Sequence, residues 1–503
     1  MHFPRSSGIL MPVFSLSDGP GIGDIGTAAF RFVDFLHSAG QTIWQMLPLG
    51  PPARGNSPYS SYSAFAGNPL LICCRSLVEH GLLTDDQLNN VGYVTDSEGQ
   101  VNYDRANAVR RPLLKLAFRT FQSDDRHALR QPFEQFRHDN ESWLRDFGRF
   151  DALSEKFGTP DWSEWPRDLV RRDSAAIKAV DEQFRDRMEF AAFEQFLFRS
   201  QWQLLKRYAN QHRIRLYGDM PIFVAYESVD VWTHQPDFEL NEAGRPTVVA
   251  GVPPDYFSAT GQMWGNPLYR WDRMAETDYD WWIQRFRDAF ESFDLLRIDH
   301  FRGFESYWEI PANAENAIGG QWKAGPGEAI FRAAQNVLGE LPIVAEDLGL
   351  ITDAVHELRD RLGFPGMRVL QFGCDDENDP YHRPDHYPKH SFAYTGTHDN
   401  NTVLGWYRER HEHSTEPQIV DRFVSGASDA VHLDLIKAVL NSAADTAIIP
   451  MQDLLGLGSE ARMNTPGEAE GNWTWRCPAA DTNNDLATKL KTWTQASGRL
   501  PTP

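Results

Sequence analysis

Residues 295–300 read Leu295-Leu296-Arg297-Ile298-Asp299-His300, a short apolar run that ends in charged side chains. Seven further apolar runs bounded by turn residues occur along the chain. Most of them are apolar on both faces, as strands covered on both sides are. The eight predicted strands cover residues 8–14, 42–49, 215–224, 293–299, 341–346, 366–372, 391–397 and 446–452.

Amphipathic helical patterns separate several of these runs, at 27–39, 279–292, 352–362 and 400–411. Eight strands that alternate with helices predict an α/β protein built as a (β/α)8 TIM barrel. An open, doubly wound sheet of eight strands is the alternative that the pattern leaves. A barrel enzyme has its catalytic residues at the C-terminal ends of its strands, so a site is expected there.

Two long segments interrupt the alternation. Residues 75–212 are mainly helical, and residues 225–277 are rich in Pro, Gly, Trp and Tyr without periodicity. Loops of that length in compact domains are usually functional or disordered. We therefore predict a single catalytic barrel over 1–503, with a mainly helical inserted subdomain at 75–212 and an inserted loop region over the active-site cleft at 225–277. No separate C-terminal β-sandwich is expected.

The composition excludes several classes of function. The chain has 49 Lys and Arg against 70 Asp and Glu, a net charge of −21, which is the wrong sign for binding nucleic acid or an anionic membrane. No run of about 18 apolar residues and no signal-peptide pattern occurs, so a cytoplasmic protein is expected. The four cysteines lack paired CxxC spacing, which predicts neither a disulfide framework nor a zinc ribbon.

A glycine-rich pattern after the first predicted strand reads Gly21-Ile22-Gly23-Asp24-Ile25-Gly26. It matches the GxGxxG pattern of dinucleotide-binding sites. However, residues 15–20 separate it from the strand, and the next strand ends without the acidic residue that would bind a ribose. We interpret the pattern as a turn that lets the backbone approach a ligand or another loop.

Carboxylates follow five of the predicted strands. Two-residue spacing places Arg297 and Asp299 on one side of their strand, where the guanidinium is expected to lower the pKa of Asp299 and keep it ionised. Glu346 follows an apolar run directly, and desolvation there is expected to raise its pKa so that it can donate a proton. A helix cap or a salt-bridge partner is the ordinary alternative for a lone carboxylate, and the cap applies above all to Asp399, which precedes a predicted helix. The five positions are Asp219, Asp299, Glu346, Asp399 and Asp453.

One ionised and one protonated carboxyl on either side of a bond is the arrangement that cleaves glycosides. The chain is also 12% aromatic, with 16 Trp, and aromatic rings can bind the C–H faces of pyranose rings as well as fill a core. Carbohydrate is therefore the predicted substrate class. A sugar-binding protein without catalysis is an open alternative, which binding without turnover would distinguish.

A metal-dependent hydrolase on the same fold is the rival with a different mechanism. It needs histidine-rich ligand sets, but His382, His386 and His390 are separated by prolines that prevent a shared helical face. The Gly-x-Ser-x-Gly turn on which many serine hydrolases depend is absent from the sequence. We predict no metal and no cofactor.

At these residues the chain resembles glycoside hydrolase family 77, the 4-alpha-glucanotransferases also called amylomaltases or disproportionating enzymes. The resemblance runs nearly from end to end, with the motifs in the expected order. The matching segments are 57–69, 218–224, 251–267, 297–303, 345–349, 396–400 and 462–467.

The resemblance implies a catalytic role for three carboxylates. Asp299 would be the nucleophile that forms a covalent glucosyl intermediate, and Glu346 would be the general acid and base. Asp399, together with His398, would bind hydroxyls of the sugar at the cleavage point and favour its distorted ring.

The resemblance also implies a set of substrate-binding residues. Arg297 would orient the nucleophile, Asp219 would support the same subsite, and Tyr59 would stack on the sugar. The segment 251–264 would form a flexible loop over the acceptor cleft. The remaining binding residues implied are Tyr256, Gln262, Trp264, His300 and Asn464.

The implied activity is transfer of α-1,4-glucan segments from a donor maltooligosaccharide or starch chain to the 4-hydroxyl of an acceptor glucan or glucose. Residue chemistry alone does not separate this transferase from a retaining α-glucan hydrolase, because both use the same double displacement. The partners expected are donor and acceptor sugars. Neither the oligomeric state nor the role of the helical insertion can be read from the sequence.

Overall fold

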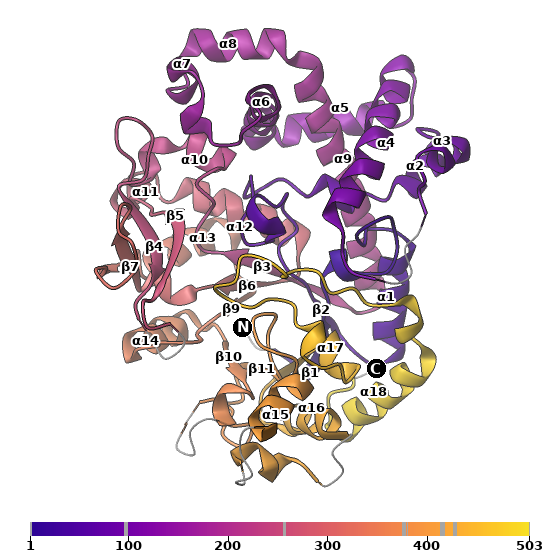
Figure 1. Ribbon diagram of the computed structural model, residues 1–503, viewed down its shortest axis with the longest axis vertical. Helices are drawn as coiled ribbons and strands as arrows, with labels where there is room; N and C mark the ends of the chain where they lie inside the picture. Colours follow the sequence, from indigo (N-terminus) through magenta and orange to yellow (C-terminus); the bar gives the residue numbers. More distant parts are fainter. Residues whose placement is uncertain are drawn as a thin grey trace.

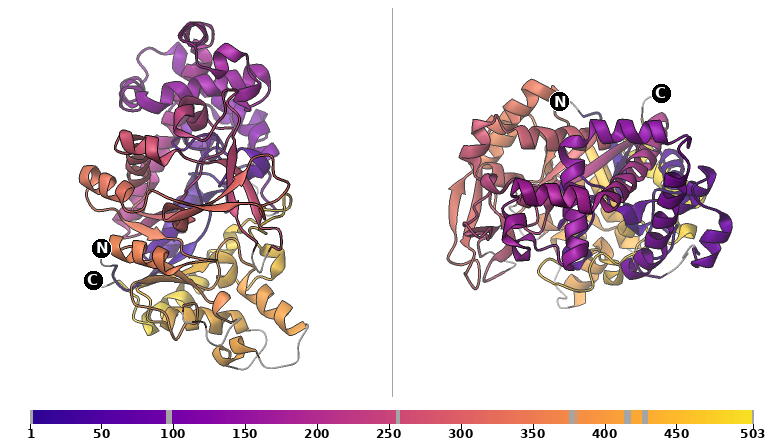
Figure 2. Two further views of the ribbon diagram at one scale, coloured as in Figure 1. Left: turned by 90° about the vertical axis from the view of Figure 1, so that its left-hand side faces the viewer. Right: turned by 90° about the horizontal axis from the view of Figure 1, so that it is seen from above.

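A computed structural model describes residues 3–94, 99–254, 258–374, 379, 381–412, 418–425 and 430–501. It consists of a barrel, a helical insertion that lies above the barrel in Figure 1, and a small second sheet beside it. The two termini lie near each other on one side of the barrel (Figure 2).

Eight parallel strands close into a barrel in the order β1-β12-β11-β10-β9-β6-β3-β2. Each of the eight predicted strands is one of them, which confirms the (β/α)8 prediction. The pairing of β1 with β12 closes the ring and rules out the open sheet. The strands are β1 (Ser6–Leu10), β2 (Ile43–Gln45), β3 (Arg215–Pro221), β6 (Leu295–Asp299), β9 (Ile343–Ala345), β10 (Gly366–Val369), β11 (Ser391–Tyr394) and β12 (Thr446–Pro450).

Amphipathic helices follow the strands and bury one face each against the barrel. Helix α12 illustrates this amphipathic pattern. It buries Trp282 and Phe286, which lie four residues apart on one face, whereas Arg287 is exposed. The helices outside the insertions are α1 (Thr27–Ser38), α12 (Asp280–Ser292), α13 (Ala329–Leu338), α14 (Asp353–Leu362), α15 (Val403–Glu412), α16 (Val431–Asn441), α17 (Met451–Leu454) and α18 (Asn484–Ala496).

The segment between β2 and β3 is mainly helical from Cys74 onwards in its described part. Its longest helix, α9, packs against α4, α5 and α6 of the insertion and reaches down to α1 and β3 of the barrel. The insertion and the barrel therefore share this helix. The helices here are α2 (Cys74–Glu79), α3 (Asp85–Asn90), α4 (Tyr103–Ser123), α5 (Arg130–Asp139), α6 (Glu141–Phe157), α7 (Arg167–Val170), α8 (Ser174–Gln183) and α9 (Arg185–Gln211).

The segment 225–277 is more ordered than the expected loop region. It contains α10 (Val229–Thr233), β4 (Val248–Val252), β5 (Gln262–Pro267) and α11 (Trp271–Glu276). Strands β4 and β5 form an antiparallel sheet with β7 (Ser306–Pro311) and β8 (Gln321–Ala324), in the order β5-β4-β7-β8. This sheet stands at the left of the barrel in Figure 1. Strand β4 pairs with β7, about 60 residues further along the chain, and such pairing leaves no local periodic signal.

The barrel closes along the seam between β1 and β12, which pairs Ser6 with Thr446. Arg499, buried at this seam, donates hydrogen bonds to five backbone carbonyls around it. Burial lowers the pKa of Arg499 to about 9. The acceptors are the carbonyl oxygens of Ser6, Leu440, Ser442, Ala444 and Asp445.

The glycine pattern at 21–26 is a packed turn. A Cβ atom on Gly23 would lie 2.2 Å from the carbonyl oxygen of Val13, and Gly21 has φ +76° against the backbone of Asn102. Protein atoms therefore occupy the space where a pyrophosphate would have to approach. The interpretation as a turn against another loop holds.

Candidate active site

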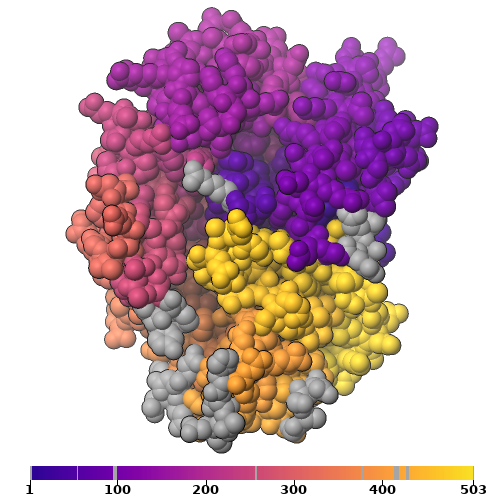
Figure 3. Space-filling view, in the orientation of Figure 1, coloured from indigo at the N-terminus to yellow at the C-terminus, as the bar shows by residue number. Residues whose placement is uncertain are grey.

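A cleft of about 660 Å³ opens at the C-terminal ends of the barrel strands. Figure 3 shows the surface hollowed between the yellow C-terminal segment, the pink residues of the β4 and β5 region, and the indigo N-terminal segment. The cleft brings together residues from six separate parts of the chain. Those predicted as site residues that line it are Tyr59, Gln262, Trp264, Asp299, His300, His398, Asp399 and Asn464.

A row of charges crosses from β3 to β6 below the cleft. The register of these strands places Asp219 beside Arg297, and Arg297 Nη1 donates to both carboxylate oxygens of Asp219 at 2.8 Å. Arg297 Nη2 lies 2.8 Å from Asp299 Oδ1. The hydroxyl of Tyr59 donates to Asp219 Oδ2 at 2.7 Å. Arg297 and Asp299 thus lie on one side of their strand, as the two-residue spacing predicts.

The expected effect of Arg297 on the Asp299 pKa is wrong in its net direction. Burial of the carboxyl raises the pKa of Asp299 above its ordinary value, and this outweighs the lowering by Arg297. The carboxylates of Asp219 and Asp399 raise it further. These two neighbours reach Asp299 through the fold, so the spacing within one strand could not reveal them.

Glu346 follows β9 and is directed at the segment after β6. Its Oε2 accepts from the backbone N–H of His300 at 2.7 Å, and its Oε1 accepts from that of Leu348 at 2.9 Å. Burial raises the pKa of Glu346 to about 7, and the nearby Asp299 raises it as well. The expectation of a raised pKa is confirmed. Glu346 can therefore hold a proton at neutral pH and release it within the pH range of most enzymes.

Asp399 is held as an anion on the opposite side of the cleft. Its Oδ1 accepts from Asn464 Nδ2 at 2.6 Å, and its Oδ2 lies 3.3 Å from His398 Nε2. Burial alone would raise the pKa of Asp399, but His398, Asn464 and Arg297 together lower it well below its ordinary value. The Tyr59 ring stacks on His398 with 5.0 Å between the centroids.

The helix-cap reading of Asp399 is wrong. The helix after it, α15, begins at Val403, whose backbone N–H donates to Asp453 Oδ1 at 2.7 Å. Asp453 also accepts from Thr395 and is buried, which raises its pKa to about 7. Asp453 therefore supports the strand ends, and Asp399 is left free to face the cleft.

His300 and two residues of β5 form the far wall of the cleft. The Trp264 ring meets His300 edge to face at 4.8 Å, and Trp264 Nε1 donates to Gln262 Oε1 at 3.1 Å. Burial lowers the pKa of His300 to about 3, so its imidazole is neutral. Its Nε2 is buried without a hydrogen-bond partner among the described residues. Tyr256, also predicted here, lies outside the described residues.

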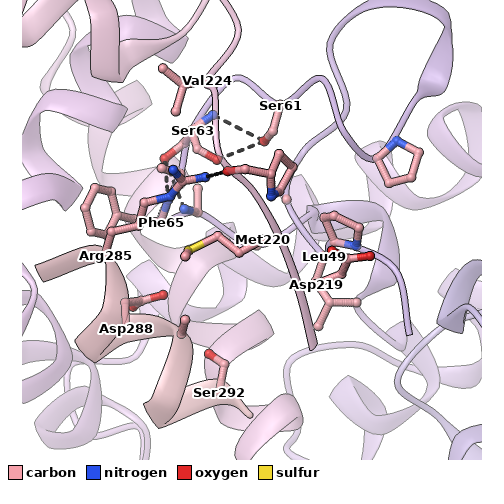
Figure 4. A pocket seen from close by; sticks show the side chains of 18 of the residues that line it. Leu49, Ser61, Ser63, Phe65, Asp219, Met220, Val224, Arg285, Asp288 and Ser292 are labelled. Carbon is pink, nitrogen blue, oxygen red and sulfur yellow. Dashed lines mark hydrogen bonds between the residues drawn. The ribbon is translucent and has the colours of Figure 1, made fainter. Parts of the chain in front are cut away.

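A separate chamber of about 110 Å³ lies behind Asp219 and Tyr59. Figure 4 shows residues of β3 and α12 facing the segment that follows β2 across it. Arg285 of α12 donates to the carbonyl oxygens of Pro221 and Ile222, and so fixes the end of the strand that carries Asp219. Among the polar residues that line the chamber are Ser61, Ser63, Asp219, Arg285, Asp288 and Ser292.

Within the described ranges, no group of three or more His, Cys, Asp and Glu side chains is placed to hold a metal ion. No helix in this part of the chain is both long and apolar enough to cross a membrane.

Comparison with known proteins assigns the chain to one family. The family model described as 4-alpha-glucanotransferase, glycoside hydrolase family 77, matches residues 11–482. The chain belongs to this family. The 4-alpha-glucanotransferase of Thermus thermophilus is 45% identical over 508 residues, which cover 99% of this chain and 100% of the relative. The chloroplastic/amyloplastic 4-alpha-glucanotransferase of Solanum tuberosum is 42% identical, covering 99% of this chain and 87% of the relative.

A solved structure agrees with this assignment to the 4-alpha-glucanotransferase family, and a second shares the fold. The amylomaltase of Streptococcus agalactiae in complex with acarbose superposes with a TM-score of 0.93 at 36% identity, covering 99% of this chain and all of the other. The Corynebacterium glutamicum amylomaltase shares the fold, with a TM-score of 0.79 at 18% identity over 99% of this chain and 75% of that one.

Sequence reasoning did not single out three residues at this site of the 4-alpha-glucanotransferase family member: Trp473 and Phe223, which line the cleft, and Arg462, which contacts Asp399. Trp473 lies 5.9 Å from the Tyr59 ring and 6.1 Å from His398, and Arg462 Nη2 donates to the backbone carbonyl of Asp399 at 2.8 Å. Phe223 lines the cleft beside Trp264. The cluster of aromatic residues near Trp473 was the only available signal for it.

Proposed function

We propose that this chain transfers α-1,4-glucan segments from a donor maltooligosaccharide or starch chain to the 4-hydroxyl of an acceptor glucan or glucose. The observation that carries the proposal is a pair of carboxyls at the ends of neighbouring strands, one of them ion-paired and the other buried with a raised pKa. Asp299 is ion-paired with Arg297, whereas Glu346 has a pKa of about 7 and no cationic partner within salt-bridge distance among the described residues. Retaining glycoside chemistry requires such a pair.

In the first step a carboxylate oxygen of Asp299 attacks C1 of the donor sugar. The bond from C1 to the bridging oxygen breaks, and the proton of Glu346 passes to that oxygen as the leaving chain departs. Arg297 stabilises the charge on Asp299 before attack. In the second step Glu346 takes the proton of the acceptor 4-hydroxyl, whose oxygen displaces Asp299 from C1 and restores its carboxylate.

Asp399 and His398 are proposed to bind hydroxyls of the sugar attached to Asp299. An anion held beside this sugar favours the positive charge that develops on its ring in the transition state. Tyr59 would stack on the same sugar, and Asp219 would keep Arg297 and Tyr59 in place. Asn464 fixes Asp399 through its 2.6 Å hydrogen bond.

The acceptor side is proposed to consist of Gln262, Trp264, His300 and Tyr256. The neutral imidazole of His300 has an unpartnered Nε2 that a sugar hydroxyl can satisfy. The segment 225–277 would cover the cleft and exclude water, which favours a sugar over water as acceptor. Residues 75–212 are proposed as an inserted subdomain. Buried free thiols at all four cysteines favour the cytoplasm as the compartment.

The test is incubation with maltotriose and analysis of the products. Glucose together with longer oligomers is the expected result. Glucose and maltose alone would show a retaining hydrolase, and unchanged substrate would show a protein that binds sugar without catalysis.

Two variants test the roles of the carboxyls. Asp299→Asn should abolish both transfer and hydrolysis while the circular dichroism spectrum stays unchanged. Glu346→Gln should still release fluoride from α-glucosyl fluoride, because fluoride leaves without acid assistance. Fluoride release no faster than cleavage of maltotriose would contradict the acid role.

A further inference from the structure

A buried carboxylate that the proposed mechanism does not use lies directly after Glu346. The Asp347 side chain is fully buried and forms ion pairs with Arg359 of α14 and Arg368 of β10. Both arginines are buried as well. Such a buried ion pair is weak evidence for stability alone, because removing its charges from water is costly. The contacts of Asp347 therefore have to be considered for their effect on the neighbouring Glu346.

The backbone of Glu346 is bonded to one neighbouring strand more firmly than to the other. On the β6 side, its N–H donates to the carbonyl oxygen of Ile298 at 3.1 Å, and its carbonyl oxygen accepts from Phe301 at 3.2 Å. On the β10 side, the register of the two described strands pairs Ala345 with Gly366 and ends there, one residue before Glu346. Backbone pairing thus leaves Glu346 without support from β10.

The Asp347 carboxylate supplies this support. Its Oδ1 accepts from the backbone N–H of Met367 at 2.7 Å, so a side chain continues the connection between β9 and β10 where the backbone pairing ends. Gly366 leaves room for the carboxylate, since a Cβ atom there would lie 2.3 Å from Asp347 Oδ2. Arg359 Nη1 donates to the same Oδ2, and Arg368 Nη1 lies 3.2 Å from it. Asp347 is therefore fixed from both β10 and α14.

This fixed residue stands between Glu346 and one of the groups that orient the Glu346 carboxyl. Leu348, directly after Asp347, donates its backbone N–H to Glu346 Oε1 at 2.9 Å. The other donor, the N–H of His300, follows β6 and does not depend on Asp347. A movement of Asp347 away from β10 would therefore shift the Glu346 backbone together with one of the two donors to its carboxyl. Misplacement by about 1 Å can cost about 10²-fold in rate.

We propose that Asp347 is a positioning residue that holds Glu346 within reach of the bridging oxygen of the donor. The inference rests on the proposed transferase function, in which Glu346 gives its proton to the leaving chain. Asp299 belongs to β6 and is held by Arg297, so its attack on C1 does not depend on the Asp347 contacts. Loss of these contacts should impair proton transfer by Glu346 and spare the attack by Asp299.

The experiment compares two donors at one pH, because kcat/KM for each reports on formation of the glucosyl intermediate. Maltotriose needs the proton of Glu346, whereas α-glucosyl fluoride does not. Asp347→Asn keeps the size of the side chain and removes its charge. It should lower kcat/KM for maltotriose about tenfold, a part of the roughly 10²–10⁴-fold that general acid catalysis contributes, and change that for α-glucosyl fluoride by less than about twofold. Arg359→Gln should change the ratio of the two values in the same direction.

Asp353→Asn is the matched control, because it makes the same chemical change at an exposed residue of α14. It should leave both kcat/KM values unchanged. An equal fall for both donors in Asp347→Asn would show that Asp347 serves the fold alone, and would overturn the proposal, as would unchanged kinetics with both. If circular dichroism shows that Asp347→Asn does not fold, the ratio for Arg359→Gln decides in the same way. Absence of maltotriose turnover by the unaltered protein would instead overturn the transferase function itself.

Discussion

Replacing Glu346 by Gln should make the protein more stable at alkaline pH while it removes catalysis. The Glu346 carboxyl has a pKa of about 7 in the folded chain against an ordinary value of 4.5. Below pH 4.5 the group is protonated in both states. As the pH rises from 4.5 to 7, the unfolded chain releases this proton and the folded chain keeps it, so the stability falls until the folded pKa is passed.

The size of the effect follows from this difference in pKa. Each unit is worth 1.36 kcal/mol, so ionisation of Glu346 costs the folded protein about 3 kcal/mol above pH 7. The entropy of unfolding of a chain this long is about 1 kcal/mol/K, from about 2 cal/mol/K per residue. The melting temperature of Glu346→Gln relative to the unaltered protein should therefore be about 3 °C higher at pH 8.5 than at pH 4.5.

Scanning calorimetry at the two pH values, at one scan rate, measures this relative shift. Glu357→Gln on α14 is the control for the loss of one carboxyl at the surface, because its side chain is 69% exposed. A melting difference for Glu346→Gln that is the same at both pH values would refute the reasoning, since the carboxyl would then not be held protonated by its surroundings.

Three further substitutions test other contacts. Tyr59→Phe should lower kcat for maltotriose transfer about tenfold, since a hydrogen bond to a charged group is worth about 1.5–3 kcal/mol; an unchanged kcat would remove the hydroxyl from the mechanism. Asn464→Ala should move the acidic limb of the pH profile of kcat/KM upwards, because the pKa of Asp399 rises when its 2.6 Å hydrogen bond is lost. Arg110→Met leaves the buried Asp24 carboxyl unpaired and should lower the melting temperature by about 3 °C, corresponding to roughly 3 kcal/mol, with kcat kept; a fall in kcat at full stability would contradict this.

The barrel strands could be predicted because the local sequence of each one is recognisable as a strand. Strands such as β6 and β12 are buried on both faces, so they read as continuous apolar runs between turns. The second sheet has no such signal. Strand β5 is exposed at three of its six positions, and β8 is exposed at three of its four positions. These strands form by pairing with residues that are distant in the chain, so their own local sequences contain no pattern that predicts them.

The site residues could be predicted where a carboxyl side chain stands at the end of a predicted strand, as at Asp299 and Glu346. Their electrostatics were predictable only in part. The raised pKa of Glu346 follows from its own position after an apolar run. That of Asp299 is raised first by burial and then by Asp219 and Asp399, which come from other parts of the chain, and these together outweigh Arg297. Trp473 was missed because it reaches the Tyr59 ring only when the C-terminal segment crosses the barrel mouth.

The seam between β1 and β12 has a consequence for folding. It joins residues some 440 positions apart, so the ring can close only after a very long loop has been ordered. The helices of the insertion make mostly nearer contacts and can form earlier. Until the ring is closed, the apolar edges of β1 and β12 are open to pairing with other chains. Arg499 donates hydrogen bonds to the backbone on both sides of this seam, so a chain without it is expected to close the ring more slowly and to aggregate more during refolding.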